Sequence, residues 1–258
     1  MRVLAIGDVV SSAGCNYLQK ALPRLKRQLA VDFCIANGEN SAAGNGITPQ
    51  SARAVFDSGV DVITTGNHVF RRRECYDLLD SRTDLLRPVN FHTSCPGRGF
   101  TVADLGYTSV GVVNLLGSAY MDRGSNPFDA MDAVLAQLKD CRVILVDFHA
   151  EATAEKKAMG YYLDGKVSAL FGTHTHVMTA DAGVLPGGTG YITDLGMTGP
   201  KRSVLGIQPE LSVAWLKTGM PTRFEAADGP CMLNGCLFEI DPKSGRALSA
   251  ESVQMEEP

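Results

Sequence analysis

Two histidines stand one residue apart in the stretch 172–177, directly after a short apolar run. The run 167–171 is bounded by glycines and has the length of a buried strand. If the backbone stays extended beyond this run, His174 and His176 point to the same side and face one site. Imidazole is the commonest metal-binding side chain at neutral pH, and such a pair can bind one ion or two neighbouring ions. Taken alone, the pair fits a solvated strand end equally well.

Other apolar runs in the chain also end in residues whose types can bind metals. These side chains are Asp8, Glu39, Asn40, Asn67, His68 and His149. Carboxylate and amide oxygens mixed with imidazoles, without cysteine, favour Fe, Mn, Co, Ni or Zn in a hydrolytic site. A carboxylate can bridge two ions about 3.5–4 Å apart, and such a pair can hold both sides of an in-line phosphoryl displacement.

The apolar runs alternate with helical patterns, as in an α/β protein with a largely parallel sheet. We expect strands at 2–6, 32–36, 60–65, 142–148, 167–171 and 189–193, and final strands at 232–240 and 247–254. We expect helices at 16–29, from Thr48-Pro49 onward, after residue 68 through 79, and at 127–138, 151–163 and 211–217. The segments 98–104 and 108–114 alternate as in an antiparallel hairpin. Ligands of parallel sheets bind outside the carboxyl ends of the strands, where the polar residues stand.

The composition excludes several classes of protein. The 258 residues are 45% hydrophobic and 20% charged, and without an internal repeat or linker they fit a single domain over 1–258. A net charge of −4 argues against stable binding to duplex nucleic acid. No apolar run reaches about 18 residues, so we expect no membrane span. The seven cysteines include no Cys-x-x-Cys pair and favour reduced thiols in a cytoplasmic location.

The order of these motifs resembles that of the calcineurin-like metallophosphoesterases, and most closely the YmdB-type 2′,3′-cyclic-nucleotide 2′-phosphodiesterases. The resemblance extends from residue 1 to the last strand. Its motifs are Gly7-Asp8-Val9-Val10 and the stretches 36–44, 65–68, 146–153, 172–177 and 193–200. It implies mixed sheets packed as a sandwich flanked by helices, with the metal site at the carboxyl ends of strands.

The resemblance also implies two metal ions that share one bridging carboxylate. The ligands implied for one ion are Asp8, Glu39, Asn40 and His176, and those for the other are Glu39, Asn67, His149 and His174. Iron is the first expectation for the metal, followed by manganese or another divalent transition metal. The wider superfamily has a histidine where this chain has Val10, and Asn40 would fill that vacancy.

The activity implied is hydrolysis of 2′,3′-cyclic nucleotides to 3′-nucleotides. The metal-bridging water would attack the phosphorus, and His68 would protonate the leaving oxygen; the alternative for His68 is a packing role. The substrate would be a small cyclic nucleotide or an RNA end. Two other functions stay open, namely a phosphomonoesterase or nuclease with the same metals, and a regulator that binds RNA or a protein. A homo-oligomer is compatible with the sequence.

The chain departs from the family directly after Val69, where the family has Trp and often Asp. Here Arg71, Arg72 and Arg73 are candidates for meeting the substrate phosphate, and the alternative is a solvated helix start. Asp147 either orients the adjacent histidine or has a purely structural role. Asp194 either supports the site or caps a strand.

Overall fold

Strand β1 (Arg2–Ile6) shows how the layers of the molecule pack. Successive side chains of a strand point to opposite faces. Val3 and Ala5 belong to an apolar cluster that is shared with a second sheet, whereas Leu4 and Ile6 belong to a cluster shared with helices. From Val3 to Ile6 the strand is buried on both faces, and these four residues are all apolar. The computed structural model describes residues 1–121 and 124–257.

Seven strands form the first sheet. Besides β1 they are β2 (Asp8–Val9), β3 (Phe33–Asn37), β4 (Val62–Thr64), β11 (Met197–Pro200), β12 (Cys231–Ile240) and β13 (Ala247–Glu256). Their order is β2-β11-β12-β1-β3-β4, with β13 also paired to β12. The strands β1, β3 and β4 are parallel, whereas β12 is antiparallel to β1, β11 and β13. The sheet is therefore mixed, whereas the alternation of strands and helices predicted a largely parallel sheet.

Six strands form the second sheet. They are β5 (Phe100–Asp104), β6 (Ser109–Leu116), β7 (Val143–His149), β8 (Ala169–Thr173), β9 (Gly183–Val184) and β10 (Gly190–Ile192), in the order β5-β6-β7-β8-β10-β9. The central four are parallel, and β5 and β9 are antiparallel edge strands. The predicted hairpin is confirmed as β5 and β6. The two sheets pack face to face through one apolar cluster.

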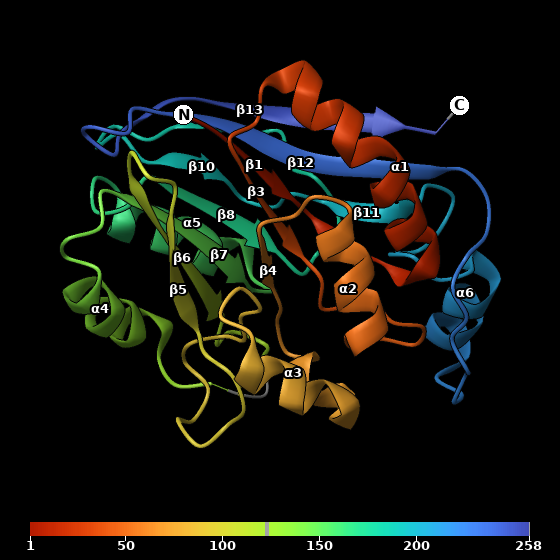
Figure 1. Cartoon of the computed structure of the whole chain (residues 1–258). Coiled ribbons are helices and arrows are strands. Elements are labelled where there is room, and N and C mark those ends of the chain that lie inside the picture. Colours follow the sequence, from red (N-terminus) through yellow and green to blue (C-terminus); the bar gives the residue numbers. More distant parts are fainter. Residues whose placement is uncertain (122–123, 258) are drawn as a thin grey trace.

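Helices cover both outer faces of the sandwich (Figure 1). They are α1 (Ser11–Leu29), α2 (Pro49–Asp57) and α3 (Tyr76–Ser81) on the first sheet, and α4 (Pro127–Gln137) and α5 (Thr153–Leu163) on the second. The helix α6 (Pro209–Thr218) lies at one end, and two short 3-10 turns, η1 (Val69–Arg71) and η2 (Arg73–Cys75), precede α3. Within the described ranges no helix is long and apolar enough to cross a membrane.

Two helix starts illustrate what local sequence can predict. At α2 the Thr48 side chain accepts a hydrogen bond from the Ser51 backbone N–H at 3.1 Å, which confirms the predicted cap. The helix α1 begins five residues earlier than predicted. The small residues before position 16 resemble a loop, but Gly14 packs so closely that a Cβ would lie 2.4 Å from the carbonyl oxygen of Thr198. Only the tertiary fold reveals that contact.

Candidate metal centre

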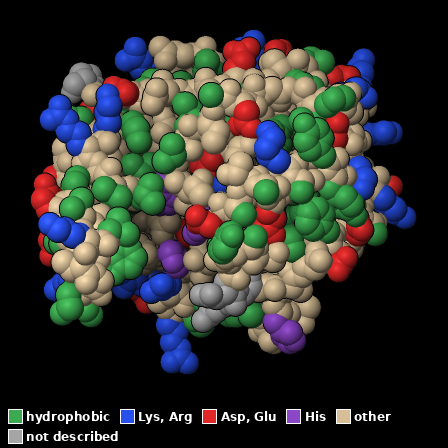
Figure 2. Space-filling model, turned by 180° about the vertical axis from the view of Figure 1, so that it is seen from behind, with side chains coloured by type: hydrophobic (Ala, Val, Ile, Leu, Met, Phe, Trp, Pro, Cys, Tyr) green, Lys and Arg blue, Asp and Glu red, His purple; other side chains and the backbone are tan. Residues whose placement is uncertain are grey.

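A cavity of about 530 Å³ opens beside the carboxyl ends of β3, β4, β7 and β8. Five of the eight predicted residues line it, namely Glu39, Asn40, His68, His174 and His176. The other three, Asp8, Asn67 and His149, adjoin this group through direct contacts. Figure 2 shows imidazoles inside a hollow of this face, beside carboxylates and apolar side chains. All eight predicted residues thus gather in one place.

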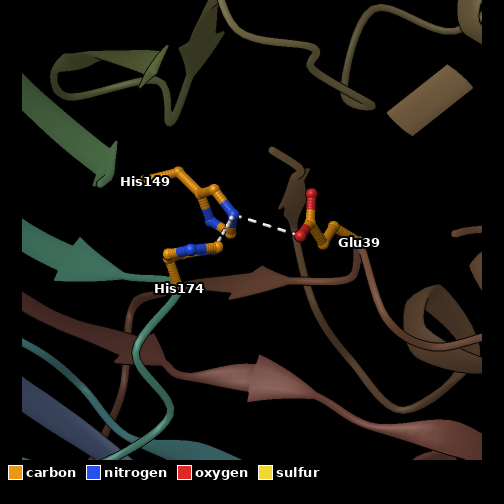
Figure 3. A group of neighbouring side chains, drawn as sticks. All are labelled: Glu39, His149 and His174. Atoms are coloured by element: carbon orange, nitrogen blue, oxygen red, sulfur yellow. Dashed lines mark hydrogen bonds and ion pairs between the residues drawn. The ribbon is translucent and has the colours of Figure 1, made fainter. Parts of the chain in front are cut away.

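His149, at the end of β7, is the centre of the first donor group (Figure 3). Its Nε2 lies 3.1 Å from Oε1 of Glu39, 3.1 Å from Oδ1 of Asn67 and 3.1 Å from Nδ1 of His174. A ring nitrogen carries at most one hydrogen, so it cannot bond to all three atoms at once. Ligands that surround one ion at about 2.1 Å are themselves about 3 Å apart. The four donors therefore fit a cation placed between them.

The second nitrogen of His149 contacts a buried hydroxyl group. Its Nδ1 lies 2.9 Å from Oγ1 of Thr173, and that hydroxyl donates its hydrogen to Oδ1 of Asp147 at 2.7 Å. The Thr173 oxygen therefore accepts from Nδ1–H, which directs Nε2 toward the donor group. Burial raises the pKa of Asp147 to about 6, although the charge of His149 opposes the rise. Of the two roles expected for Asp147, these contacts favour the orientation of His149.

A second donor group lies around Asp8, which is fully buried. Oδ2 of Asp8 accepts a hydrogen bond from the backbone N–H of His174 at 3.1 Å. Oδ1 has no hydrogen-bond partner among the described residues and lies 3.5 Å from Nε2 of His176. A buried carboxylate oxygen without a partner is unfavourable, unless a cation satisfies it. The pair of Asp8 and His176 therefore also fits a cation.

Glu39 borders both donor groups. Its Oε1 contacts His149 and also lies 3.5 Å from Nδ2 of Asn40, whose Nδ2 is in turn 3.4 Å from Nε2 of His176. The amide of Asn40 would have to turn over to offer its oxygen to a cation, because Oδ1 now faces Nδ1 of His68 at 3.2 Å. The position of Glu39 is that of a carboxylate able to bridge two ions.

The protonation states of Glu39, Asp8 and His174 suit cation binding, whereas His149 must first lose a proton. Burial alone would raise the pKa of Glu39, but the charge and hydrogen bond of His149 hold it well below its usual value. The pKa of Asp8 is likewise lowered by His176 against the effect of burial. Burial and the charge of His149 lower the pKa of His174 to about 4, so this ring is neutral. Burial would lower the pKa of His149, but the charge of Glu39 raises it to about 9.

The backbone of the His174–His176 stretch differs from the extended form that the sequence suggested. Strand β8 ends at Thr173, and His174 and His176 have φ values of 94° and 63°. These lie in the left-handed region, which side chains other than glycine rarely adopt, so surrounding contacts must hold it. The extended backbone, on which the two side chains were expected to face one site together, is therefore not present here. The turn places the side chain of His174 beside His149 and that of His176 beside Asp8.

A buried ion pair supports this turn. Nζ of Lys156 donates to Oδ2 of Asp194 at 2.7 Å, and both side chains are at most 1% exposed. Thr175, between the two histidines, donates its hydroxyl hydrogen to the same Asp194 oxygen at 2.6 Å and its backbone N–H at 3.3 Å. Of the two roles expected for Asp194, these contacts favour support of the site. Lys156 could not be predicted from the sequence, because nothing in the helical pattern of α5 marks it as buried.

His68 lies beside the donors and also lines the cavity. Its backbone N–H donates to Oε2 of Glu39 at 2.9 Å, and its Nδ1 lies 3.3 Å from Oε1 of the same carboxylate. Its Nε2 makes no hydrogen bond to the described part of the chain. This nitrogen is therefore free to meet a ligand in the cavity.

The three arginines after His68 take different positions. The guanidinium of Arg72 donates to backbone carbonyl groups of the loop 43–45, including that of Asn45 at 3.2 Å. That loop lines the cavity, so the hydrogen bonds of Arg72 stabilise this part of the cavity wall. Arg71 and Arg73 are exposed, and neither is among the described residues that line the cavity.

Gly66 leaves the space that the donors need. A Cβ at this position would lie 2.2 Å from Nε2 of His149 and 2.5 Å from Oε2 of Glu39. Any other residue would push these donors apart. The sequence offered Gly66 only as part of a motif, and its role depends on contacts between distant strands.

The chain is similar to several known proteins. A family model described as YmdB-like protein matches residues 4–253. A 2′,3′-cyclic-nucleotide 2′-phosphodiesterase from Bacillus subtilis is 42% identical over 98% of this chain and 96% of its own length. The crystal structure of a novel phosphatase from Mycoplasma pneumoniae has a TM-score of 0.94 at 34% identity, covering 99% of this chain and 93% of that one.

A more distant structure identifies the fold. A calcineurin-like phosphoesterase from Bacillus subtilis has a TM-score of 0.53 at 11% identity, covering 100% of this chain and 90% of that one. The expected fold, two mixed sheets packed as a sandwich with flanking helices, is thereby confirmed. The donor groups around His149 and Asp8 have the chemistry to bind divalent cations.

Proposed function

The chain belongs to the family of YmdB-like proteins, and from this premise we propose that it hydrolyses 2′,3′-cyclic nucleotides to 3′-nucleotides at a dinuclear metal site. The observation that carries the proposal is the convergence of Glu39, Asn67 and His174 on Nε2 of His149. Asp8, with its unpaired buried oxygen, supports a second ion beside the first. The 2′,3′-cyclic-nucleotide activity in the name of the Bacillus subtilis relative supports the choice of substrate.

The ligand sets that we propose follow the two donor groups. One ion is held by Asp8, Glu39, Asn40 and His176, and the other by Glu39, Asn67, His149 and His174. When bound, two such ions lower the pKa of the attacking water and neutralise the charge of the phosphate. Iron remains the first candidate, with manganese or another divalent transition metal next, and donors that combine imidazole with oxygen suit all of these metals.

His68 is the proton donor in this proposal. The carboxylate of Glu39 holds its Nδ1, so that Nε2 can face the substrate. The water gives one proton to solvent and its oxygen adds to phosphorus. The bond between phosphorus and O2′ breaks, and Nε2–H of His68 protonates O2′ and then regains a proton from solvent. The product keeps its phosphate on O3′.

The seven unpaired cysteines support the expected cytoplasmic location.

The direct test of the activity is an assay of the purified protein with 2′,3′-cyclic AMP and added Mn²⁺ or Fe²⁺. We expect 3′-AMP as the product, and for His68→Ala a kcat lower by about 10²- to 10⁴-fold, as for the loss of a general acid. His92→Ala is the matched control, because His92 is exposed and contacts Ser94 rather than the cavity. Turnover of phosphomonoesters alone would favour a phosphatase, and absence of turnover with every substrate would favour a regulator.

Metal binding should depend on pH in a defined direction. The pKa of His149 is raised to about 9 in the metal-free protein, so at pH 7 its ring is protonated and a metal must displace that proton. The apparent metal affinity should therefore increase about tenfold per pH unit up to pH 9 and then level off. Calorimetric titration with Mn²⁺ in buffers of different ionisation enthalpy measures the released proton. An affinity that is constant between pH 6.5 and 9 would contradict the role of His149.

A further inference from the structure

One side of the cavity is apolar and takes no part in the hydrolysis described above. Its residues, here called the apolar wall, are Leu205, Ile207, Phe224 and Ala226. Leu205 is 47% exposed and Phe224 is 42% exposed. Apolar surface of this kind is stabilised when a ligand covers it, and in a concave site it indicates what the ligand is made of.

Backbone hydrogen bonds within the protein hold the apolar wall in place. Val204 and Ile207 exchange two backbone hydrogen bonds of 2.9 and 3.0 Å, and the segment 224–227 pairs with this turn through Gln208 and Ala227. The turn requires Gly206, which has a φ of 95°. These backbone bonds fix the direction in which the side chains of the wall point.

Phe224 is held by an aromatic neighbour. Trp215 of α6 packs against it with ring centroids 5.6 Å apart and an angle of 87° between the planes. This edge-to-face contact is a favourable aromatic arrangement, and it restrains the ring while leaving Phe224 partly exposed toward the cavity. The ring therefore offers a preformed flat surface.

The apolar wall adjoins the metal donors directly. The carbonyl oxygen of Leu205 lies 3.3 Å from Nδ1 of His176, so the wall begins at a proposed ligand. The cavity of about 530 Å³ is also within the range of about 300–1,000 Å³ that is usual for small-molecule sites. A ligand whose phosphate lies at the metals can therefore extend its other end over the wall.

We propose that the apolar wall binds the nucleobase of the substrate, which stacks on Phe224. The inference rests on the proposed function and adds the group that the site recognises beyond the phosphate. Leu205, Ile207 and Ala226 have no polar side-chain atom, so the wall contacts the face of a base without reading its edges. Every base has such a face, and the site should therefore accept all four.

The test compares two cyclic phosphodiesters, of which only one has a base. In Phe224→Ala, the ratio of kcat/KM for 2′,3′-cyclic AMP to that for glycerol 1,2-cyclic phosphate should fall about 5- to 150-fold, which is the usual effect of losing one stacked base. The change should be in KM, because the base lies away from the reacting bond. Phe224→Tyr keeps the ring and should restore the ratio.

The matched control is Leu216→Ala on α6, which removes an apolar side chain that is 70% exposed and outside the cavity lining. It should leave the ratio unchanged. An equal loss with both substrates in Phe224→Ala, or no loss with either, would overturn the proposal. Thermal unfolding of each variant separates loss of fold from loss of binding.

Binding of 3′-AMP to the Mn²⁺-loaded protein separates this proposal from the proposed activity. If the wild type hydrolyses neither cyclic diester, the proposed function fails. Calorimetry then tests the role of the apolar wall in binding. Phe224→Ala should weaken the binding of 3′-AMP and leave the binding of glycerol 3-phosphate unchanged. Equal binding of 3′-AMP by wild type and Phe224→Ala would reject the stacking role.

Discussion

Replacing Lys156 by methionine should lower the free energy of unfolding by about 3–5 kcal/mol. Lys156 and Asp194 are 1% and 0% exposed and 2.7 Å apart, so the substitution leaves a buried carboxylate without its cation. Burial already raises the pKa of Asp194, against the charge of Lys156. The variant should therefore also bind metal more weakly, because Asp194 holds Thr175 between the two histidines. Urea unfolding followed by circular dichroism measures the loss of stability.

The adjacent residue provides the control for this prediction. Lys157 pairs with Asp181 at 3.2 Å on the surface, with side chains 46% and 35% exposed. Exposed pairs of this kind contribute about 0–1 kcal/mol, so Lys157→Met should shift the unfolding midpoint only slightly. If both variants lose the same stability, the buried pair has no special role in the fold.

Replacing Glu39 by glutamine should remove the metals and the activity together. Glu39 is fully buried, and its carboxylate contacts His149 at 3.1 Å and borders both donor groups. The amide keeps the shape but lacks the charge and offers only one oxygen. Loss of a partner outside the ligand shell already costs about 10–100-fold in metal affinity, so loss of the bridging carboxylate should cost more than about 100-fold. Equilibrium dialysis with Mn²⁺ measures this affinity.

Glu151→Gln makes the same chemical change at the border of the site. Oε2 of Glu151 lies 3.0 Å from Nε2 of His174, and the side chain is 50% exposed. This carboxylate supports a proposed ligand from outside, so its loss should reduce the metal affinity by at most about 10–100-fold. A loss as large as that of Glu39→Gln would contradict a larger role for Glu39 in metal binding than for this carboxylate at the border.

The position of the candidate site could be predicted from the sequence because its donors follow apolar strands. Asp8, Glu39, Asn67 and His149 each come shortly after such a run, and parallel strands bring their carboxyl ends to the same edge. The sandwich of mixed sheets was expected only from the family resemblance. The alternation of strands and helices predicts that neighbouring strands are parallel. It does not predict the position of β12, which lies near the end of the sequence and pairs with β1.

Other features depend on contacts that no local pattern records. The left-handed φ values of His174 and His176 need Asp8 and Asp194 to hold the turn, and these residues are distant in the sequence. The burial of Lys156 is likewise a tertiary effect. Phe224 stands in a segment without regular secondary structure, and only the cavity lining relates it to the donors.

The most direct test of the account is a count of metal ions per chain in protein purified and reloaded with Mn²⁺. Inductively coupled plasma mass spectrometry should find two ions per chain in the wild type and none in Glu39→Gln. His176→Ala should keep one ion, since His176 contacts the Asp8 group and His149 the other. A single ion per chain in the wild type, or two ions in Glu39→Gln, would contradict a dinuclear site bridged by Glu39.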